Sequence, residues 1–172
     1  MKKIISFTQL KSIRQTVGDK RRVVLMSGVF DLFHYGHFKA LEKASRMGDL
    51  LIVQIDGNQL VKKRKSTNRP YLDEGVRARM IAAFEFVDYV FISNAPSESK
   101  RTLKGMAPHV YIRALLPEQT PLTRTLREKK LNALVPKMKV VWLPQTAEIS
   151  TTKIISVVGK TRTEFTRLYH FH

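Results

Sequence analysis

The chain has no cysteine and no long apolar run. Without cysteine it cannot form disulfides, thiolate metal sites or iron–sulfur clusters, and thiol catalysis is excluded. Because no run of about 18 apolar residues occurs, we expect no membrane-spanning helix. Nothing in the composition points to an oxidising compartment, so a cytoplasmic protein is expected.

Acidic residues are scarce, since 14 Asp and Glu stand against 31 Lys and Arg, for a formal net charge of +17. A charge of this size attracts phosphate-bearing partners, whether a nucleotide, a nucleic acid or an anionic membrane. With 172 residues, 43% of them hydrophobic, the chain can build one globular domain over residues 1–172.

We expect this domain to begin with a helical extension, residues 1–22, and to end with a tail, residues 159–172. The first segment is basic enough to pass for an organellar transit peptide. Its apolar residues recur at roughly helical spacing and lead directly into a β-rich stretch, which favours a packed helix. These residues are Ile4, Ile5, Phe7, Leu10 and Ile13.

Short β-rich runs alternate with longer helix-like stretches along the chain. The expected strands are residues 23–26, 50–55, 89–92, 110–112 and 140–143. The expected helices are residues 34–47, 73–86, 97–105, 122–134 and 150–158. Strands joined through helices of this length form a parallel sheet, so we predict an α/β fold with a doubly wound five-stranded parallel sheet and helices on both faces. Ligands bind such sheets beyond the carboxyl ends of the strands.

Two histidines follow the first expected strand, in the segment 28–37 (GVFDLFHYGH). Gly28 permits a tight turn, and the helix that follows directs its free N–H groups at that turn, which suits an anion. His34 and His37 are three residues apart and share one helix face, while Gly36 leaves room between them. We predict a phosphate site here. Polar residues at an ordinary helix start, or a metal-binding pair, are the alternatives.

Two further polar segments follow later strands. Hydroxyl groups cluster at the expected start of the last helix, at Ser150, Thr151 and Thr152, where they could bind phosphate or merely cap the helix. A basic irregular segment, residues 62–70, follows the second strand and carries Lys62, Lys65 and Arg69, with Arg77 beyond it. It is either a solvated loop or a lid over a phosphoryl group.

The pattern Gly-x-Phe-Asp-x-x-His-x-Gly-His directly after a β-rich run resembles the cytidylyltransferase-like nucleotidyltransferase superfamily, whose His-x-Gly-His signature binds the triphosphate of an NTP. The segment 149–154 (ISTTKI) looks like its second signature, which binds the β- and γ-phosphates. Residues 62–77 resemble bacterial heptose 1-phosphate adenylyltransferases, whereas residues 140–154 are also similar to glycerol-3-phosphate cytidylyltransferases. Class I aminoacyl-tRNA synthetases share the first signature but are longer than this chain.

This resemblance implies a Rossmann-like nucleotidyltransferase that moves an NMP group from an NTP to a small phosphorylated acceptor and releases pyrophosphate. ATP with a heptose 1-phosphate-type sugar phosphate is the first expectation, and CTP with glycerol 3-phosphate or another alcohol phosphate is the second. A catalytically divergent basic protein that binds nucleic acid or an NTP is the alternative of another class. A homodimer and Mg²⁺ are also expected.

The resemblance also assigns roles to residues. The expected catalytic residues are His34, His37, Lys62 and Lys65. The expected nucleotide-binding residues are Gly28, Val29, Phe30, Gly36, Arg77, Ser150, Thr151 and Thr152. Arg69 and Arg113 are expected to bind the acceptor, and Asp31 is the expected ligand of Mg²⁺.

The chain departs from both families after the fourth expected strand. They carry an acidic turn near the acceptor and the nucleotide, whereas this chain reads Arg113-Ala114-Leu115. The cytidylyltransferases have Arg-Thr before their second signature, where this chain has Gln145-Thr146. Either an altered specificity or a loss of activity is predicted.

Overall fold

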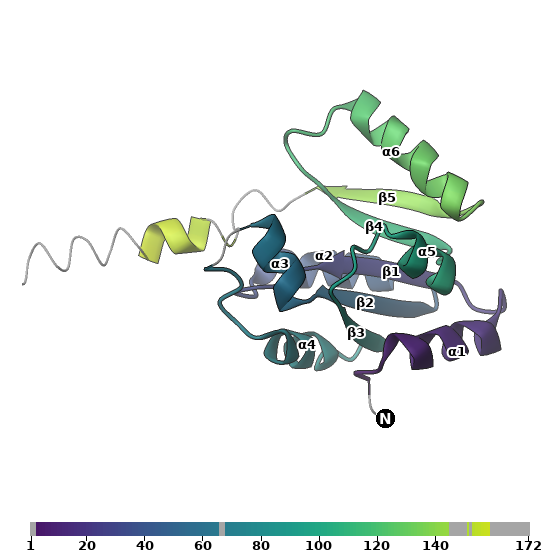
Figure 1. Ribbon diagram of the computed structural model, residues 1–172, viewed down its shortest axis with the longest axis horizontal. Helices are drawn as coiled ribbons and strands as arrows, with labels where there is room; N and C mark the ends of the chain where they lie inside the picture. Colours follow the sequence, from purple (N-terminus) through teal and green to yellow (C-terminus); the bar gives the residue numbers. More distant parts are fainter. Residues whose placement is uncertain (1–2, 66–67, 145–150, 152, 159–172) are drawn as a thin grey trace, which may run out of the picture.

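A five-stranded, all-parallel sheet forms the centre of the computed structural model, which describes residues 3–65, 68–144, 151 and 153–158 (Figure 1). The strand order is β3-β2-β1-β4-β5. The strands are β1 (Val23–Gly28), β2 (Leu50–Asp56), β3 (Tyr89–Ser93), β4 (Val110–Leu115) and β5 (Lys139–Pro144). All five expected strands are present, and the predicted α/β class is confirmed.

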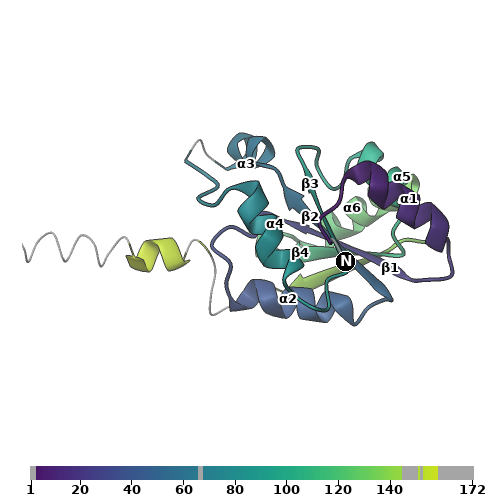
Figure 2. The same ribbon diagram turned by 90° about the horizontal axis from the view of Figure 1, so that it is seen from below.

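Helices cover both faces of the sheet (Figure 2). One face carries α1 (Phe7–Val17), α5 (Lys100–Met106) and α6 (Pro121–Leu134), and the other carries α2 (Tyr35–Ser45) and α4 (Glu74–Ala82). The short helix α3 (Asn58–Arg64) follows β2 at the carboxyl edge of the sheet. Among the described residues, none of the helices is long and apolar enough to cross a bilayer.

The sheet separates two apolar cores, because successive residues of a strand point to opposite faces. On β2, Leu51 and Val53 pack toward α2 and α4, whereas Leu50 and Ile52 pack toward α1, α5 and α6. All residues of β2 are buried, as expected for a central parallel strand.

The N-terminal segment forms the expected helix. Ser6 begins α1 with a capping box, in which the Ser6 side chain accepts from the Gln9 backbone N–H and the Gln9 side chain accepts from the Ser6 N–H. Leu10 is fully buried in the core beneath α1. The expected tail, residues 159–172, lies outside the described residues.

Part of the basic segment 62–70 is helical rather than irregular, which corrects the sequence expectation. Gly57 is the N-cap of α3, and the buried side chains of Leu60 and Val61 anchor the helix to the domain. Its last turn contains Lys62, Lys63 and Arg64. Cations are favourable at this end because the helix dipole is negative there, so the charge run that suggested a loop instead stabilises a helix terminus.

Candidate active site

The turn between β1 and α2 has a constrained shape. β1 ends at Gly28, and the backbones of Phe30 and Leu32 adopt left-handed φ values of 52° and 47°. A Cβ atom at Gly28 would lie 2.9 Å from Phe30 Cε2, so the ring can fold back over the turn only because residue 28 is glycine. The turn ends at His34, the N-cap of α2.

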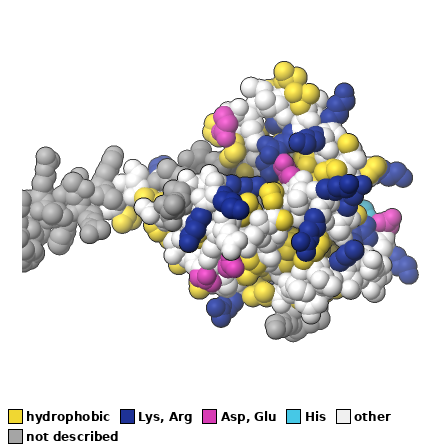
Figure 3. All heavy atoms as spheres, in the orientation of Figure 1, with side chains coloured by type: hydrophobic (Ala, Val, Ile, Leu, Met, Phe, Trp, Pro, Cys, Tyr) yellow, Lys and Arg dark blue, Asp and Glu magenta, His cyan; other side chains and the backbone are white. Residues whose placement is uncertain are grey.

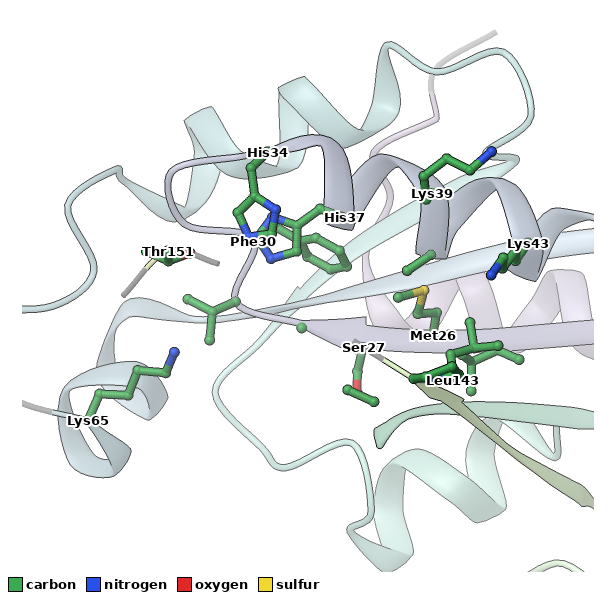
Figure 4. Close-up of a pocket in the computed structure, with 17 residues that line it drawn as sticks. Met26, Ser27, Phe30, His34, His37, Lys39, Lys43, Lys65, Leu143 and Thr151 are labelled. Atoms are coloured by element: carbon green, nitrogen blue, oxygen red, sulfur yellow. The ribbon is translucent and has the colours of Figure 1, made fainter. Parts of the chain in front are cut away.

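A cavity of about 350 Å³ lies beside this turn, between one face of α2 and the ends of β4 and β5 (Figure 4). Eight of the expected site residues line it: Gly28, Val29, Phe30, His34, Gly36, His37, Lys65 and Thr151. Within the described part of the chain, no aspartate or glutamate lines the cavity. Its polar lining is therefore cationic or neutral, which suits an anionic ligand.

The rings of the two histidines stack on each other at the N-terminal end of α2 (Figure 4). Their ring centroids are 3.8 Å apart with an interplanar angle of 22°, and the His37 ring also contacts the Phe30 ring at 5.3 Å. Both Nδ1 atoms are buried, and neither has a hydrogen-bond partner among the described residues. Unpaired buried polar atoms are costly, so a ligand that satisfies them would bind favourably.

The environment keeps this histidine pair uncharged at neutral pH. Burial lowers the pKa of His34. Burial first, and then repulsion from His34 when it is protonated and from Lys65, lowers the pKa of His37 to about 4. An anion in the cavity would favour the protonated imidazoles and raise these pKa values. The pair is therefore a site whose positive charge can develop when an anion binds.

The two lysines expected to act together are placed differently. Lys65 caps the C-terminal end of α3 and lines the cavity, and burial together with the charge of Arg69 lowers its pKa. Lys62 lies on α3 with an exposed side chain, outside the residues that line the cavity. Both side chains are exposed, but Lys65 lines the cavity of the histidines and Lys62 does not.

The carboxylate of Asp31, the expected ligand of Mg²⁺, has partners inside the fold. Asp31 is 1% exposed and accepts hydrogen bonds from the backbone N–H groups of Tyr71 and Leu72, at 3.0–3.1 Å. Arg69 Nε lies 2.9 Å from Asp31 Oδ2 as an ion pair. Arg69 Nη2 is buried and has no hydrogen-bond partner within the described residues, so this guanidinium keeps a donor for a ligand.

Arg77 is also built into the fold, which corrects the expectation that it binds the nucleotide. Its side chain is fully buried and donates to the backbone oxygens of Val29, Asp56 and Leu72, at 2.6–2.9 Å. A fourth bond, of 2.7 Å, goes to Asn58 Oδ1. Arg77 thus ties the turn after β1 to the start of α3, and acts on the cavity only through the turn it holds.

Arg113 lies on the other face of the sheet, which corrects its assignment to the acceptor. It pairs with Glu98 at 2.7 Å and lies about 6 Å from the ring centroids of Tyr111 and Trp142. Its neighbour Ala114 lines the cavity instead. Because strand residues alternate between faces, a one-residue step along β4 decides which side chain reaches the cavity.

One described residue of the second sequence signature, Thr151, lines the same cavity as the histidines. Thr151 Oγ1 donates a 3.0 Å hydrogen bond to the backbone oxygen of Asp31, so it touches the turn that carries the histidines. Ser150 and Thr152 lie outside the described residues. Thr151, more than 100 residues beyond the histidines in sequence, therefore lies beside the turn that carries them.

Sequence reasoning missed several residues of the cavity wall: Lys39, Ala40 and Lys43 on α2, and Leu143 at the end of β5. Gly36, Ala40 and Lys43 recur at helical spacing, so the periodicity of α2 was a signal that could have found them. Lys39 forms a 2.6 Å ion pair with Glu42. Leu143 and Ala114 make the far wall apolar, in contrast to the histidine end.

Replacing Arg77 with methionine should lower the free energy of unfolding by about 3 kcal/mol or more, because buried backbone oxygens would lose their donors. Urea denaturation measures this change. Arg79→Met, at an exposed position of the same helix, is the matched control and should stay within about 0.5 kcal/mol. Equal effects of the two substitutions would show that Arg77 does not hold the turn.

Comparison with known proteins identifies relatives over most of the chain. The family model described as cytidylyltransferase-like matches residues 25–157. The bifunctional protein HldE of Campylobacter jejuni subsp. doylei is 45% identical over 104 residues, which cover 51% of this chain but 23% of that protein. This chain thus spans about a quarter of the length of that relative. The FAD synthase of Pyrococcus abyssi is 37% identical over 142 residues, or 80% of this chain and 93% of that protein.

Solved structures share the fold at low sequence identity. The lipopolysaccharide core biosynthesis protein from Thermoplasma volcanium matches with a TM-score of 0.62 and 21% identity, over 73% of this chain and 98% of that chain. The pantoate-beta-alanine ligase from Francisella tularensis matches with a TM-score of 0.62 and 14% identity, over 91% of this chain and 76% of that chain. Both likenesses concern the arrangement of the sheet and its helices.

Proposed function

The chain belongs to the cytidylyltransferase-like family and is a nucleotidyltransferase; we propose that it transfers the adenylyl group of ATP to the phosphate of a small acceptor, first a heptose 1-phosphate-type sugar phosphate. The observation that carries this proposal is the stacked pair His34 and His37, whose buried Nδ1 atoms lack partners among the described residues beside a cavity without carboxylates. Such a pair suits the phosphates of an NTP.

In the proposed reaction, an oxygen of the acceptor phosphate attacks the α-phosphorus of ATP in line. The bond from the α-phosphorus to the bridging oxygen breaks, and pyrophosphate leaves with that oxygen. No covalent enzyme intermediate is required. The chain contributes by positioning two anions and by stabilising the charge on the transferring phosphoryl group.

We assign roles to the side chains that line the cavity from their places in it, and to Arg69, Ser150 and Thr152 from the resemblance to the family. His34 and His37 hold the triphosphate and gain positive charge as it binds. Lys65 approaches from α3 on the opposite side of the turn (Figure 4) and neutralises charge on the transferring group. Arg69 does not line the cavity, but its buried Nη2 lacks a partner among the described residues and is the proposed donor to the acceptor phosphate. Thr151, with Ser150 and Thr152, supplies hydroxyl groups to the β- and γ-phosphates.

The described residues do not provide a protein-held metal site. They contain no group of three or more His, Asp or Glu side chains that could hold a metal ion, and the oxygens of Asp31 are already bonded. Mg²⁺ commonly binds through phosphate oxygens and a few waters, with few protein ligands. In this proposal it enters as part of the substrate Mg·ATP, and no catalytic step depends on a protein ligand to it.

The relatives favour adenylyl transfer but differ in the acceptor. HldE proteins match the chain at 45% and 44% identity over about half its length. The FAD synthase match covers nearly the whole of that protein, so FMN is a second candidate acceptor. Cytidylyl transfer to glycerol 3-phosphate stays the third candidate. The apolar wall of Ala114 and Leu143 supports an acceptor or base unlike those recognised through a carboxylate.

A panel experiment tests the substrate assignment. Pyrophosphate release is measured with each of four NTPs, in combination with heptose 1-phosphate, FMN and glycerol 3-phosphate. We expect ATP with heptose 1-phosphate to give the highest kcat/KM. Preference for ATP with FMN would show that the acceptor is FMN and not a heptose 1-phosphate. Preference for CTP with glycerol 3-phosphate would show that both proposed substrates are wrong.

Replacing His34 or His37 with alanine should lower kcat for pyrophosphate release by about 100-fold or more, since each removes a contact to the charge that develops on the phosphates. The unfolding midpoint in urea should change little for His34→Ala, because this side chain is only partly buried. His109→Gln, a histidine outside the cavity, is the control for general effects of the substitution. Wild-type turnover by both alanine variants would disprove the phosphate role of the pair.

A further inference from the structure

The face of the sheet covered by α1, α5 and α6 is far more basic than the opposite face. These three helices contain nine lysines and arginines and a single glutamate, Glu128. The helices of the other face, α2 and α4, balance four basic residues with two glutamates. Figure 3 shows Lys and Arg side chains spread over the first of these faces. Among the helices that cover the sheet in the described residues, the excess of positive charge is thus greater on this face than on the face of the candidate active site.

A hollow of about 670 Å³ lies within this face, between α1 and α5. Four exposed cationic side chains line it: Lys11, Lys100, Arg101 and Lys104. No carboxylate lines the hollow. Among the described residues, no aspartate or glutamate forms an ion pair with any of these four side chains. The hollow shares no lining residue with the cavity of the histidine pair.

This arrangement works against the stability of the isolated protein. Lys100 and Lys104 are four residues apart on α5, and like charges at this spacing repel each other. Lys11 on α1 borders the same hollow and adds a third positive charge. A polyanion would remove the repulsion and release its own counterions on binding.

We propose that the α1–α5 hollow binds the sugar-phosphate backbone of a nucleic acid. Charge complementarity favours a polyanion over a neutral partner. None of the exposed large apolar side chains of the described residues lies on α1 or α5, so the hollow has nothing to insert into a lipid surface. A row of phosphates along the hollow can meet several of its cations at once.

The hollow contacts the backbone and not the bases. Phe7, its aromatic side chain, packs against Phe91 at 5.7 Å and lies under the Arg101 guanidinium at 5.6 Å. Its ring is therefore not free to stack on a base, which is how proteins grip unpaired bases. Binding is expected to be insensitive to sequence and strongly dependent on salt.

Two triple variants of the full chain test this proposal. The first, Lys11→Gln/Lys100→Gln/Lys104→Gln, neutralises the hollow. The second, Lys20→Gln/Arg79→Gln/Lys139→Gln, removes the same charge from exposed positions outside the hollow. Binding of a fluorescent 20-nucleotide strand is measured between 50 and 300 mM salt, with saturating Mg·ATP present to occupy the candidate active site.

The hollow variant should bind at least tenfold more weakly than the wild type near 100 mM salt, and its slope of log K against log salt should be smaller by about 2, the value for three lost phosphate contacts. The control variant should bind within about threefold of the wild type. Equal weakening of both variants would show that only the net charge matters. Absence of binding by the wild type, or binding only to phosphatidylserine vesicles or polyglutamate, would also overturn the proposal.

Discussion

The candidate active site depends on two buried charges, Asp31 and Arg77, which fix the turn after β1. Asp31 holds the backbone of Tyr71 and Leu72, and Arg77 holds the carbonyl oxygens of Val29, Asp56 and Leu72. Both side chains are almost completely buried. Burial of such groups is costly unless each is hydrogen-bonded, and here the bonds connect the turn after β1 to residues 71–72, to the end of β2 and to the start of α3. The cavity keeps its shape because these loops cannot move separately.

This rigid edge presents polar groups that lack partners within the described residues. The Nδ1 atoms of His34 and His37 and the Nη2 atom of Arg69 are buried donors or acceptors without a hydrogen bond there. The Lys65 side chain comes from a different element, α3. In a preorganised site, such groups stabilise transition-state charge without rearranging during the reaction. The uncharged state of the histidines also limits the repulsion between them before the nucleotide binds.

The sequence predicted the strands and the segment that lines the cavity, because these depend on local pattern. Runs of β-branched and apolar residues define the strands, and the segment 28–37 follows the first of them. The roles of Asp31, Arg77 and Arg113 could not be predicted in the same way. The direction of Asp31 depends on left-handed backbone at Phe30 and Leu32, and the direction of Arg113 on the register of β4. The short helix α3 was not predicted, because a run of charged residues suggested an irregular segment there.

The central claim is that the phosphates of the nucleotide bind against the histidine pair. The most direct measurement is an NMR pH titration that gives the pKa of His37 from the chemical shift of its imidazole Cε1–H. The titration is carried out with and without Mg·ATP. The free protein should show a pKa of about 4, because burial and the neighbouring charges of His34 and Lys65 disfavour the imidazolium. A bound triphosphate should raise this pKa, since negative charge stabilises the protonated ring. An unchanged pKa in the complex with saturating Mg·ATP would contradict the account.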